Sequence, residues 1–279
     1  MKVAIIGIGL IGGSMAIALK QKGIADRIIG VDASEGHRKQ AIELGLVDET
    51  MELEDAVRQA DIVILAVPVN EAEKLLPKIL DIVTKQIVFD TGSTKNLLCR
   101  IAEVHTNGKR FVATHPMWGT EHSGPEAAVK DAFLKKAVVI CNKENSDTDA
   151  LEVVEKIYRE LEMHILYMNA PAHDLHAAYV SHISHITSFA LANTVLEKER
   201  EDDAIFEMAS GGFESTVRLA KSNPAMWVPI FMENRENVLD VLNEHISQLR
   251  KFKSCLEKEN YEYLAELIGN ANKIKRILQ

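Results

Sequence analysis

The feature that most constrains this sequence is a glycine-rich turn close to its start. Gly7, Gly9 and Gly12 follow the apolar residues 2–6 with the spacing G-x-G-x-x-G. In a strand–turn–helix unit that binds a dinucleotide, the first glycine permits the tight turn and the second lets the backbone approach a pyrophosphate. The third allows the helix to pack closely on the strand. A glycine-rich turn without a ligand is the structural alternative.

The residues around this turn predict the type of nucleotide. Leu10 and Ile11 open the following helix, where unpaired N–H groups and the positive end of the helix dipole attract phosphates. Asp32 ends the next apolar run, about 20 residues after the glycines. A carboxylate there accepts hydrogen bonds from ribose hydroxyls and repels a 2′-phosphate, so we expect NAD rather than NADP. The basic residues 37–39 leave NADP open, unless they are the solvent-facing side of a helix.

Short β-branched runs alternate with amphipathic segments through the first part of the chain. The runs expected as strands are 2–6, 27–31, 62–67, 86–90, 110–114 and 137–141, followed by 163–167. The segments expected as helices are 11–22, 35–44, 70–83, 95–106 and 151–161. This alternation predicts an α/β fold with a doubly wound parallel sheet, which is a Rossmann domain given the glycine turn. We expect it to span residues 1–168.

The pattern changes after Asn169, where helical periodicity replaces strand signals. Residues 170–198 are expected as one long helix, and the glycine pair at 211–212 separates it from later helices. The sequence thus predicts an all-helical second domain over residues 169–279. So much apolar helix surface in about 110 residues favours a homodimer formed through this half.

Composition excludes several classes of partner. The 279 residues carry a net charge of −9, which argues against nucleic acid or an anionic membrane as the main partner. Cys99, Cys141 and Cys255 share no metal-type spacing and are expected as reduced thiols. No apolar run is long enough to cross a bilayer, and the first strand begins at Lys2, which leaves no room for a signal peptide. We therefore expect a cytoplasmic protein.

Two further strand ends should lie along a bound dinucleotide. Val67 and Pro68 close one strand at the carboxyl edge of the sheet, where a nicotinamide arm would run. Asp90 ends the next strand and is expected with them among the cofactor-binding residues. Ser93 follows it, either as a helix cap or beside the nicotinamide, and both roles are compatible.

The loop after the strand 110–114 carries the best candidate for proton transfer. His115 begins a polar loop at the carboxyl edge, where doubly wound sheets bind ligands. A histidine suits proton transfer near neutral pH, although a histidine at a strand end is often structural. Thr120 and Glu121 belong to the same loop.

The second domain offers histidines and an arginine. His182 and His185 are three residues apart on the expected helix, with His173 and His176 before them. No carboxylate or thiol completes a metal set, so zinc is not expected. We expect His182 to face the interdomain cleft as a ligand-binding donor, while for His185 a packed, hydrogen-bonded role is the alternative. Arg218 presents a planar fork for a carboxylate, or forms a salt bridge with one of the many acids.

Together these blocks resemble the prephenate/arogenate dehydrogenase family of tyrosine biosynthesis. The resemblance covers nearly the whole chain. In order, its blocks are Gly-Leu-Ile-Gly-Gly-Ser at 9–14, Gly92-Ser93, His115-Pro116-Met117 with Gly119-Thr120-Glu121 and Ser123-Gly124, Ser181-His182 with His185, Ser210-Gly211-Gly212-Phe213, and Ser222-Asn223-Pro224 with Met226-Trp227.

The resemblance implies oxidative decarboxylation of prephenate to 4-hydroxyphenylpyruvate, with reduction of NAD⁺ and release of CO₂. It implies that His115 takes the proton of the substrate 4-hydroxyl and that Ser93 orients that hydroxyl. The implied substrate contacts are Arg218 for a carboxylate, with His182, Thr120 and Glu121. We expect Arg218 at the pyruvyl carboxylate, since holding the departing carboxylate would oppose loss of CO₂.

Three other functions compete with this one. Arogenate is the alternative substrate, and the residues that depart from the family pattern, Trp118, Ser184 and Glu214, leave that choice open. A β-hydroxyacid dehydrogenase would place a catalytic lysine on the long helix, but residues 179–197 contain none. A non-catalytic NAD(H)-sensing module would bind the cofactor without turnover.

Overall fold

Within residues 1–199 and 205–277, which the computed structural model describes, an eight-stranded sheet organises the first half of the chain. The strand order is β3-β2-β1-β4-β5-β6-β7-β8. The bounds are β1 (Lys2–Ile6), β2 (Arg27–Val31), β3 (Glu49–Thr50), β4 (Ile62–Leu65), β5 (Ile87–Asp90), β6 (Phe111–Pro116), β7 (Ala137–Cys141) and β8 (His164–Met168). The order reverses between β1 and β4, the place where doubly wound sheets bind ligands.

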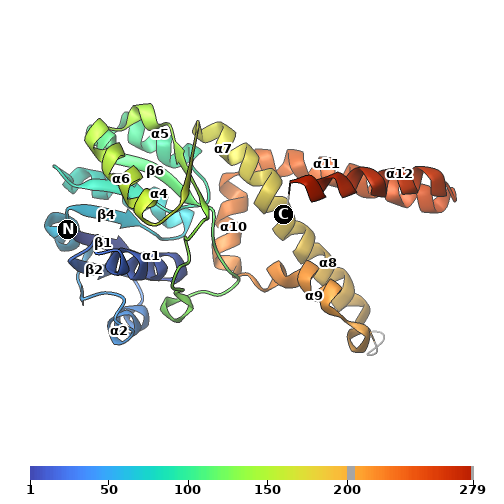
Figure 1. Cartoon of the computed structure of the whole chain (residues 1–279), viewed down its shortest axis with the longest axis horizontal. Helices are drawn as coiled ribbons and strands as arrows, with labels where there is room; N and C mark the ends of the chain where they lie inside the picture. The colour runs from blue at the N-terminus through green and yellow to red at the C-terminus, as the bar shows by residue number, and fades with distance from the viewer. Residues whose placement is uncertain (200–204, 278–279) are drawn as a thin grey trace.

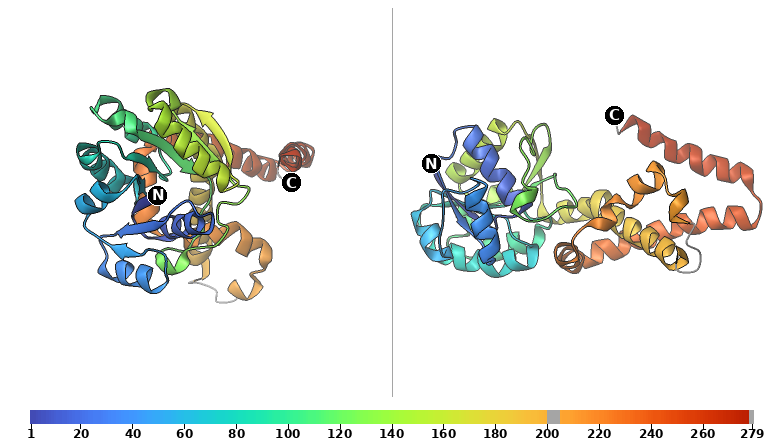
Figure 2. Two further views of the ribbon diagram at one scale, coloured as in Figure 1. Left: turned by 60° about the vertical axis from the view of Figure 1, so that its left-hand side comes forward. Right: turned by 90° about the horizontal axis from the view of Figure 1, so that it is seen from below.

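Helices cover both faces of the sheet, as Figures 1 and 2 show. They are α1 (Leu10–Gln21), α2 (Glu35–Glu43), α3 (Leu53–Gln59), α4 (Val69–Ile82), α5 (Asn96–Val104) and α6 (Thr148–Glu160). Residues of α1 and α6 share one buried apolar cluster with the sheet, and residues of α3, α4 and α5 share the other. All four residues of β4 are buried, because helices exclude water from both of its faces.

The sheet differs from the expected parallel sheet at one edge. β6 and β7 pair antiparallel, with Ala113 opposite Cys141. A parallel neighbour needs a crossover, usually a helix. The fully described connection 117–136 contains only a short 3-10 turn, Pro125–Ala127, and returns directly into β7. The short elements β3 and α3 lie in a stretch for which the sequence had predicted no element.

The second half is helical from Ala170 onward. Its helices are α7 (Ala170–Ala177), α8 (Ile183–Glu199), α9 (Gly211–Val217), α10 (Pro224–Glu233), α11 (Arg235–Glu257) and α12 (Tyr261–Ala271). The expected long helix is interrupted by a π-helical turn, Ala178–His182, between α7 and α8. Such turns insert an extra residue and shift the faces of the helix that follows. Residues 200–204 and 278–279, part of the expected helical domain, lie outside this description.

The two halves meet beside the carboxyl edge of the sheet. Val69 of α4 packs against Trp227 and Ile230 of α10 in a small apolar cluster. α11 extends away from the sheet, and α12 turns back from its far end (Figure 2). Among the described residues, no helix is both long enough and apolar enough to span a bilayer.

Candidate active site

Three adjoining cavities in the described part of the molecule form a groove along the carboxyl edge. The outer cavity has a volume of about 580 Å³, the middle cavity about 220 Å³ and the inner cavity about 310 Å³. Gly9, Val67 and Pro68 line both the outer and the middle cavity. Leu10, Ile11, Ser93 and Met226 line both the middle and the inner cavity. The three therefore form one continuous path.

The glycine turn lies at the centre of this path. Gly7 has φ +94°, and a Cβ there would lie 2.5 Å from the Ala66 carbonyl oxygen. At Gly12, a Cβ would lie 2.0 Å from the Gly7 carbonyl oxygen, so packing of α1 on the turn excludes a side chain. Around Gly9, no described atom lies within 4 Å of such a Cβ. The open position therefore faces the cavities and leaves room for a close ligand.

Asp32 presents its carboxylate to the outer cavity in a fixed orientation. Its Oδ2 accepts the Ile8 N–H at 2.9 Å, and its Oδ1 accepts the Ser34 N–H at 2.9 Å. His37 Nδ1 lies 3.3 Å from Oδ1, and Arg38 donates to the Asp32 carbonyl at 2.6 Å. His37 and Arg38 thus line the outer cavity beside the acid, although the His37 side chain is also 42% exposed.

The middle cavity extends from the glycine turn to the inner cavity. Leu10 and Ile11 come from the start of α1, and Val67 and Pro68 from the end of β4. Ser93, in the loop after β5, reaches both cavities. A ligand lying on the turn would therefore end beside Ser93.

Asp90, expected as a cofactor contact, is fully buried and lines none of the three cavities of the described chain. Its carboxylate pairs with the buried Lys95 ammonium and accepts the N–H groups of Gly92 and Thr114, each at 2.9 Å. Lys95 also donates to the Thr114 carbonyl at 2.8 Å. Asp90 thus ties the ends of β5 and β6 together behind the loop that carries Ser93.

His115 lies at the end of β6, in the wall of the inner cavity. Its Nδ1 is 2.8 Å from Nε2 of His173 on α7. Burial, and after it the neighbouring His173, Lys95 and His182, hold the pKa of His115 well below its usual value of 6.5. The ring is therefore neutral at neutral pH and able to accept a proton.

The hydrogen-bond partners of His115 were not predicted from the sequence, where His173 was weighed only as a metal ligand. His173 Nδ1 lies 2.8 Å from Asp174 Oδ1. Asp174 in turn accepts the backbone N–H groups of Lys95 and Asn96 at 2.8 and 2.9 Å, at the start of α5. The adjacent His-Asp pair just after the domain change is the signal that would have pointed to them.

Of the two later histidines of the long helix, His182 does not face the groove, whereas His185 is packed, lies 3.1 Å from the Ser181 carbonyl oxygen through Nδ1, and also reaches the inner cavity. His182 is 1% exposed, lines none of the three cavities of the described chain, and has Nδ1 3.1 Å from Asn234 Nδ2. Burial lowers its pKa to about 4. His185 lines the inner cavity and stacks on Trp227, with ring centroids 3.4 Å apart. The π-helical turn before His185 shifts the helix faces, which residue spacing alone does not show.

Arg218 both faces a cavity that could hold a carboxylate and forms a salt bridge, the two alternatives expected from the sequence. It lines the inner cavity together with Thr120, and its side chain is 51% exposed. Its guanidinium also pairs with Glu121 Oε2 at 2.9 Å. A backbone N–H and the Arg218 guanidinium lower the pKa of Glu121. The site therefore holds a cation that is already partnered by an acid of its own chain.

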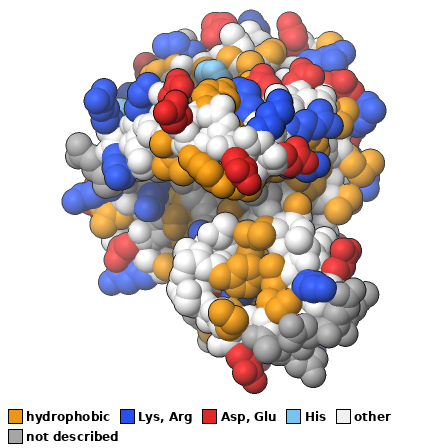
Figure 3. Space-filling model, turned by 90° about the vertical axis from the view of Figure 1, so that its right-hand side faces the viewer, with side chains coloured by type: hydrophobic (Ala, Val, Ile, Leu, Met, Phe, Trp, Pro, Cys, Tyr) orange, Lys and Arg blue, Asp and Glu red, His pale blue; other side chains and the backbone are white. Residues whose placement is uncertain are grey.

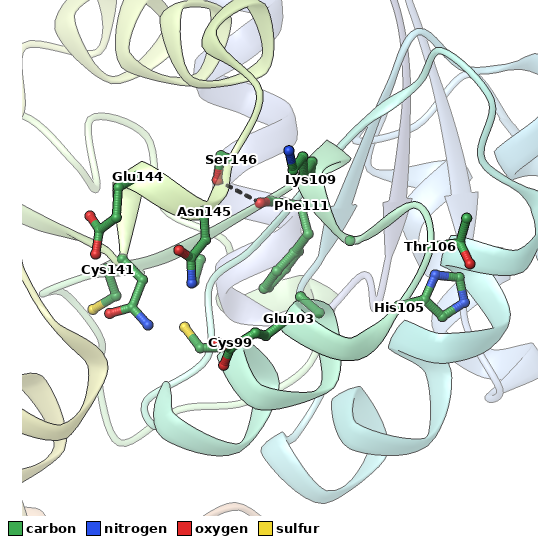
Figure 4. Close-up of a pocket in the computed structure, with 14 residues that line it drawn as sticks. Cys99, Glu103, His105, Thr106, Lys109, Phe111, Cys141, Glu144, Asn145 and Ser146 are labelled. Carbon is green, nitrogen blue, oxygen red and sulfur yellow. Dashed lines mark hydrogen bonds between the residues drawn. The ribbon is translucent and has the colours of Figure 1, made fainter.

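A separate cavity of about 290 Å³ lies between α5 and the end of β7 (Figure 4). Cys99 and Cys141 line it together with Glu103, His105 and Lys109. Burial raises the pKa of Cys99 to about 12 and that of Cys141 still further, so both thiols are protonated. None of the site residues predicted from the sequence lies there. Within the described ranges, no group of three His, Cys, Asp or Glu side chains is arranged to hold a metal ion.

Known proteins resemble this chain over nearly its whole length. Residues 15–167 match the family model of the prephenate dehydrogenase nucleotide-binding domain, and residues 169–270 match that of the prephenate dehydrogenase dimerization domain. Prephenate dehydrogenase of Bacillus subtilis is 31% identical over 94% of this chain and 72% of the relative. Cyclohexadienyl dehydrogenase of Zymomonas mobilis is 30% identical over 99% of this chain and 96% of the relative.

A solved structure extends this likeness to three dimensions. It is prephenate dehydrogenase from A. aeolicus in complex with hydroxyphenyl propionate and NAD⁺. The TM-score is 0.90 at 32% identity, covering 99% of this chain and 97% of the other. The fold class predicted from the sequence is confirmed. The chain belongs to the prephenate dehydrogenase family of oxidoreductases, as its motifs predicted.

Proposed function

We propose that this chain catalyses the NAD⁺-dependent oxidative decarboxylation of prephenate to 4-hydroxyphenylpyruvate. One observation carries the proposal: Ser93 lines both the middle and the inner cavity, and the inner cavity contains a neutral His115 and a cationic Arg218. A dinucleotide along the groove would therefore end next to a base and an anion-binding group. The relative solved with hydroxyphenyl propionate and NAD⁺ supports this pairing of ligands.

The residues of the outer and middle cavities suit NAD⁺. Gly9, with open space beside it, and the N–H groups of Leu10 and Ile11 would hold the pyrophosphate. Asp32 would accept the ribose hydroxyls, while Val67 and Pro68 would flank the nicotinamide arm. When bound, NAD⁺ supplies the acceptor for the hydride. His37 and Arg38 beside Asp32 keep NADP⁺ as the alternative to be tested.

In the proposed reaction His115 is the general base. Its Nε2 accepts the proton of the C4 hydroxyl while the C4 hydrogen leaves as hydride, and a C4 carbonyl forms. The bond from C1 to its carboxylate then breaks, its electron pair enters the ring, and CO₂ and an aromatic phenolate result. The phenolate takes the proton back from His115 Nε2 to give the phenol, which leaves His115 neutral again. Ser93 would orient the hydroxyl by a hydrogen bond. Positioning and general-base catalysis are the contributions required of the protein.

Arg218 would bind the side-chain carboxylate of the substrate. Prephenate is a dianion and the chain carries a net charge of −9, so a local cation is needed to hold it. Thr120 and His185 line the same cavity and are proposed as further contacts. His182 is buried against Asn234, so we propose that it supports the cavity wall instead of touching the substrate.

Arogenate is the second candidate substrate, and the Arg218–Glu121 pair favours it. An amino-acid side chain carries a carboxylate and an ammonium group side by side. Arg218 and Glu121, with their charged atoms 2.9 Å apart, offer the complementary charges.

We also propose a two-domain homodimer, with domains at 1–168 and 169–279. Large apolar side chains are exposed on α11 and α12: Leu249, Leu256, Tyr261 and Ile268 are each at least 50% exposed. Figure 3 faces this end of the molecule and has hydrophobic side chains exposed among charged ones. Such surface normally marks an interface. The mass in solution, measured by light scattering, tests the dimer.

A cytoplasmic location is proposed from three buried, unpaired cysteines.

The test of the reaction is NADH formation by the purified protein. Prephenate and arogenate are compared, each with NAD⁺ and NADP⁺, in the native protein and in His115→Asn. The matched control is His176→Asn, an exposed histidine on α7. We expect turnover of prephenate with NAD⁺, a loss of roughly 10²–10⁴-fold in His115→Asn and none in the control. Tight NAD⁺ binding without turnover of either substrate would overturn the proposal in favour of a nucleotide sensor.

A further inference from the structure

We propose that His173 and Asp174 of the helical domain are positioning residues that fix the tautomer of His115, so that its Nε2 meets the substrate without a proton. The inference rests on the proposed role of His115 as general base. Neither residue lines the inner cavity in the described structure, so neither is a substrate contact. Both act through the ring of His115.

The chain of hydrogen bonds starts from Asp174. Its side chain is buried, and its oxygens face three N–H donors: the backbone of Lys95 at 2.8 Å, that of Asn96 at 2.9 Å, and His173 Nδ1 at 2.8 Å. With two backbone N–H groups already donating to it, the carboxylate is the acceptor in this network and donates no proton. The proton on the His173 ring must therefore be on Nδ1.

The same logic fixes the ring of His115. A neutral His173 protonated on Nδ1 has a bare Nε2, and this atom lies 2.8 Å from His115 Nδ1. One of two facing ring nitrogens must carry the proton, so His115 donates from Nδ1. A neutral His115 then has a bare Nε2, which is the lone pair that proton abstraction requires. The opposite arrangement would place two lone pairs against each other between His173 and Asp174.

The groups around His115 agree with a neutral starting ring. Lys95 is the nearby cation, paired with Asp90, while His182 and His173 are the other titratable neighbours. When His115 Nε2 gains the substrate proton, its Nδ1–H bond to His173 strengthens, and the ionised Asp174 stabilises the new positive charge. The hydroxyl proton is bound to Nε2, and no further oxidant or acid is needed.

This arrangement makes the base depend on contact between the domains. His115 and the N–H groups of Lys95 and Asn96 belong to the α/β half, whereas His173 and Asp174 lie on α7 of the helical half. Asn234 at the start of α11 donates to the Asp174 carbonyl at 2.6 Å and also contacts His182. Asn234 therefore anchors α7 where the chain of bonds requires it.

Two substitutions of His173 separate positioning from general structure. In His173→Gln, the side-chain amide can donate to Asp174 and accept from His115, which preserves the polarity of both bonds. In His173→Phe, the ring remains and both bonds are lost. We expect kcat to fall about a hundredfold in His173→Phe, to stay within about tenfold of the native value in His173→Gln, and KM to change little in either. His176→Phe, at an exposed position of the same helix, is the matched control.

A purely structural role predicts a different pattern. Equal kcat values in the Gln and Phe variants, or a Phe variant with native kcat, would overturn the proposal. Thermal unfolding and NAD⁺ affinity of each variant establish that folded proteins are being compared.

A direct measurement needs neither substrate nor a folded variant of His173. In ¹⁵N-histidine-labelled native protein, NMR distinguishes a protonated ring nitrogen from a bare one, and the signal missing from His115→Asn identifies the ring. We expect a proton on Nδ1 of His115 and none on Nε2. A proton on Nε2 overturns the inference even in an active enzyme. The expected tautomer in a protein that turns over neither substrate contradicts the proposed function instead.

Discussion

Glu121 Oε2 lies 2.9 Å from the guanidinium of Arg218, across the boundary between the middle and inner cavities. The arginine that faces the candidate substrate cavity is thus already neutralised by a carboxylate from the loop after β6. An anionic substrate must compete with this carboxylate for the same N–H groups. A substrate with an ammonium group beside its carboxylate would instead be met by both charges.

Removal of the Glu121 charge should therefore affect the two substrates in opposite directions. In Glu121→Gln we expect KM for prephenate to fall about three- to tenfold and KM for arogenate to rise, with kcat nearly unchanged. Glu126→Gln is the control, because Glu126 is exposed in the same loop and bonds to Gln40. Steady-state kinetics with both substrates check this. A higher KM for prephenate in Glu121→Gln would show that Glu121 assists binding.

The pH dependence of activity should follow the depressed pKa of His115. The base acts when neutral, and burial holds its pKa well below 6.5. We expect kcat/KM to stay constant as pH falls through 6.5 and to decline only at clearly lower pH. Lys95→Met removes one of the charges that disfavour protonation of His115, so in a folded variant the acid limb should move to higher pH. A profile that bends at 6.5 in the native protein would contradict the burial of this ring.

His182 should make stability depend on pH in the same range. Its pKa is about 4 in the folded protein and about 6.5 in an unfolded chain, so the unfolded state binds more protons below pH 6.5. The folded state is therefore favoured fully above pH 6.5 and loses stability as pH falls toward 4, by on the order of 3 kcal/mol. Denaturant unfolding at several pH values measures this. In His182→Gln the fall in the free energy of unfolding between pH 6.5 and 4 should be smaller by that amount, and an unchanged fall would contradict the prediction.

Local signals in the sequence predicted the parts of the site that are built locally. The turn at Gly7–Gly12 and the acid at Asp32 each depend on a few neighbouring residues and the strand before them. Their placement on the outer and middle cavities follows from strand order, which alternating strands and helices determine. Ser93 and His115 were predicted near each other because each follows a strand that ends at the same edge, whereas Arg218 was assigned to the site through the family resemblance.

The features that the sequence did not predict depend on contacts between distant residues. The antiparallel pairing of β7 depends on a long connection without an α-helix. The position of His185, rather than His182, at the inner cavity depends on one π-helical turn. The His115–His173 bond joins residues 58 positions apart in two domains. Periodicity shows which face of a helix is apolar, but it does not show which polar side chain of another domain lies opposite.

Asp90 gives the last test, because its expected role and its position make opposite predictions. A cofactor contact would lower NAD⁺ affinity when altered and leave stability unchanged. The buried pair with Lys95 predicts the reverse: Asp90→Asn leaves the ammonium of a fully buried lysine without its counter-charge. Removing one partner of such a pair costs about 3–5 kcal/mol.

We therefore expect Asp90→Asn to have a lower free energy of unfolding, measured with denaturant, and an NAD⁺ Kd within about threefold of native in the remaining folded protein. Glu103→Gln on α5, which bears no such pair among the described contacts, should leave both quantities unchanged. Native stability together with weakened NAD⁺ binding in Asp90→Asn would return Asp90 to the cofactor site.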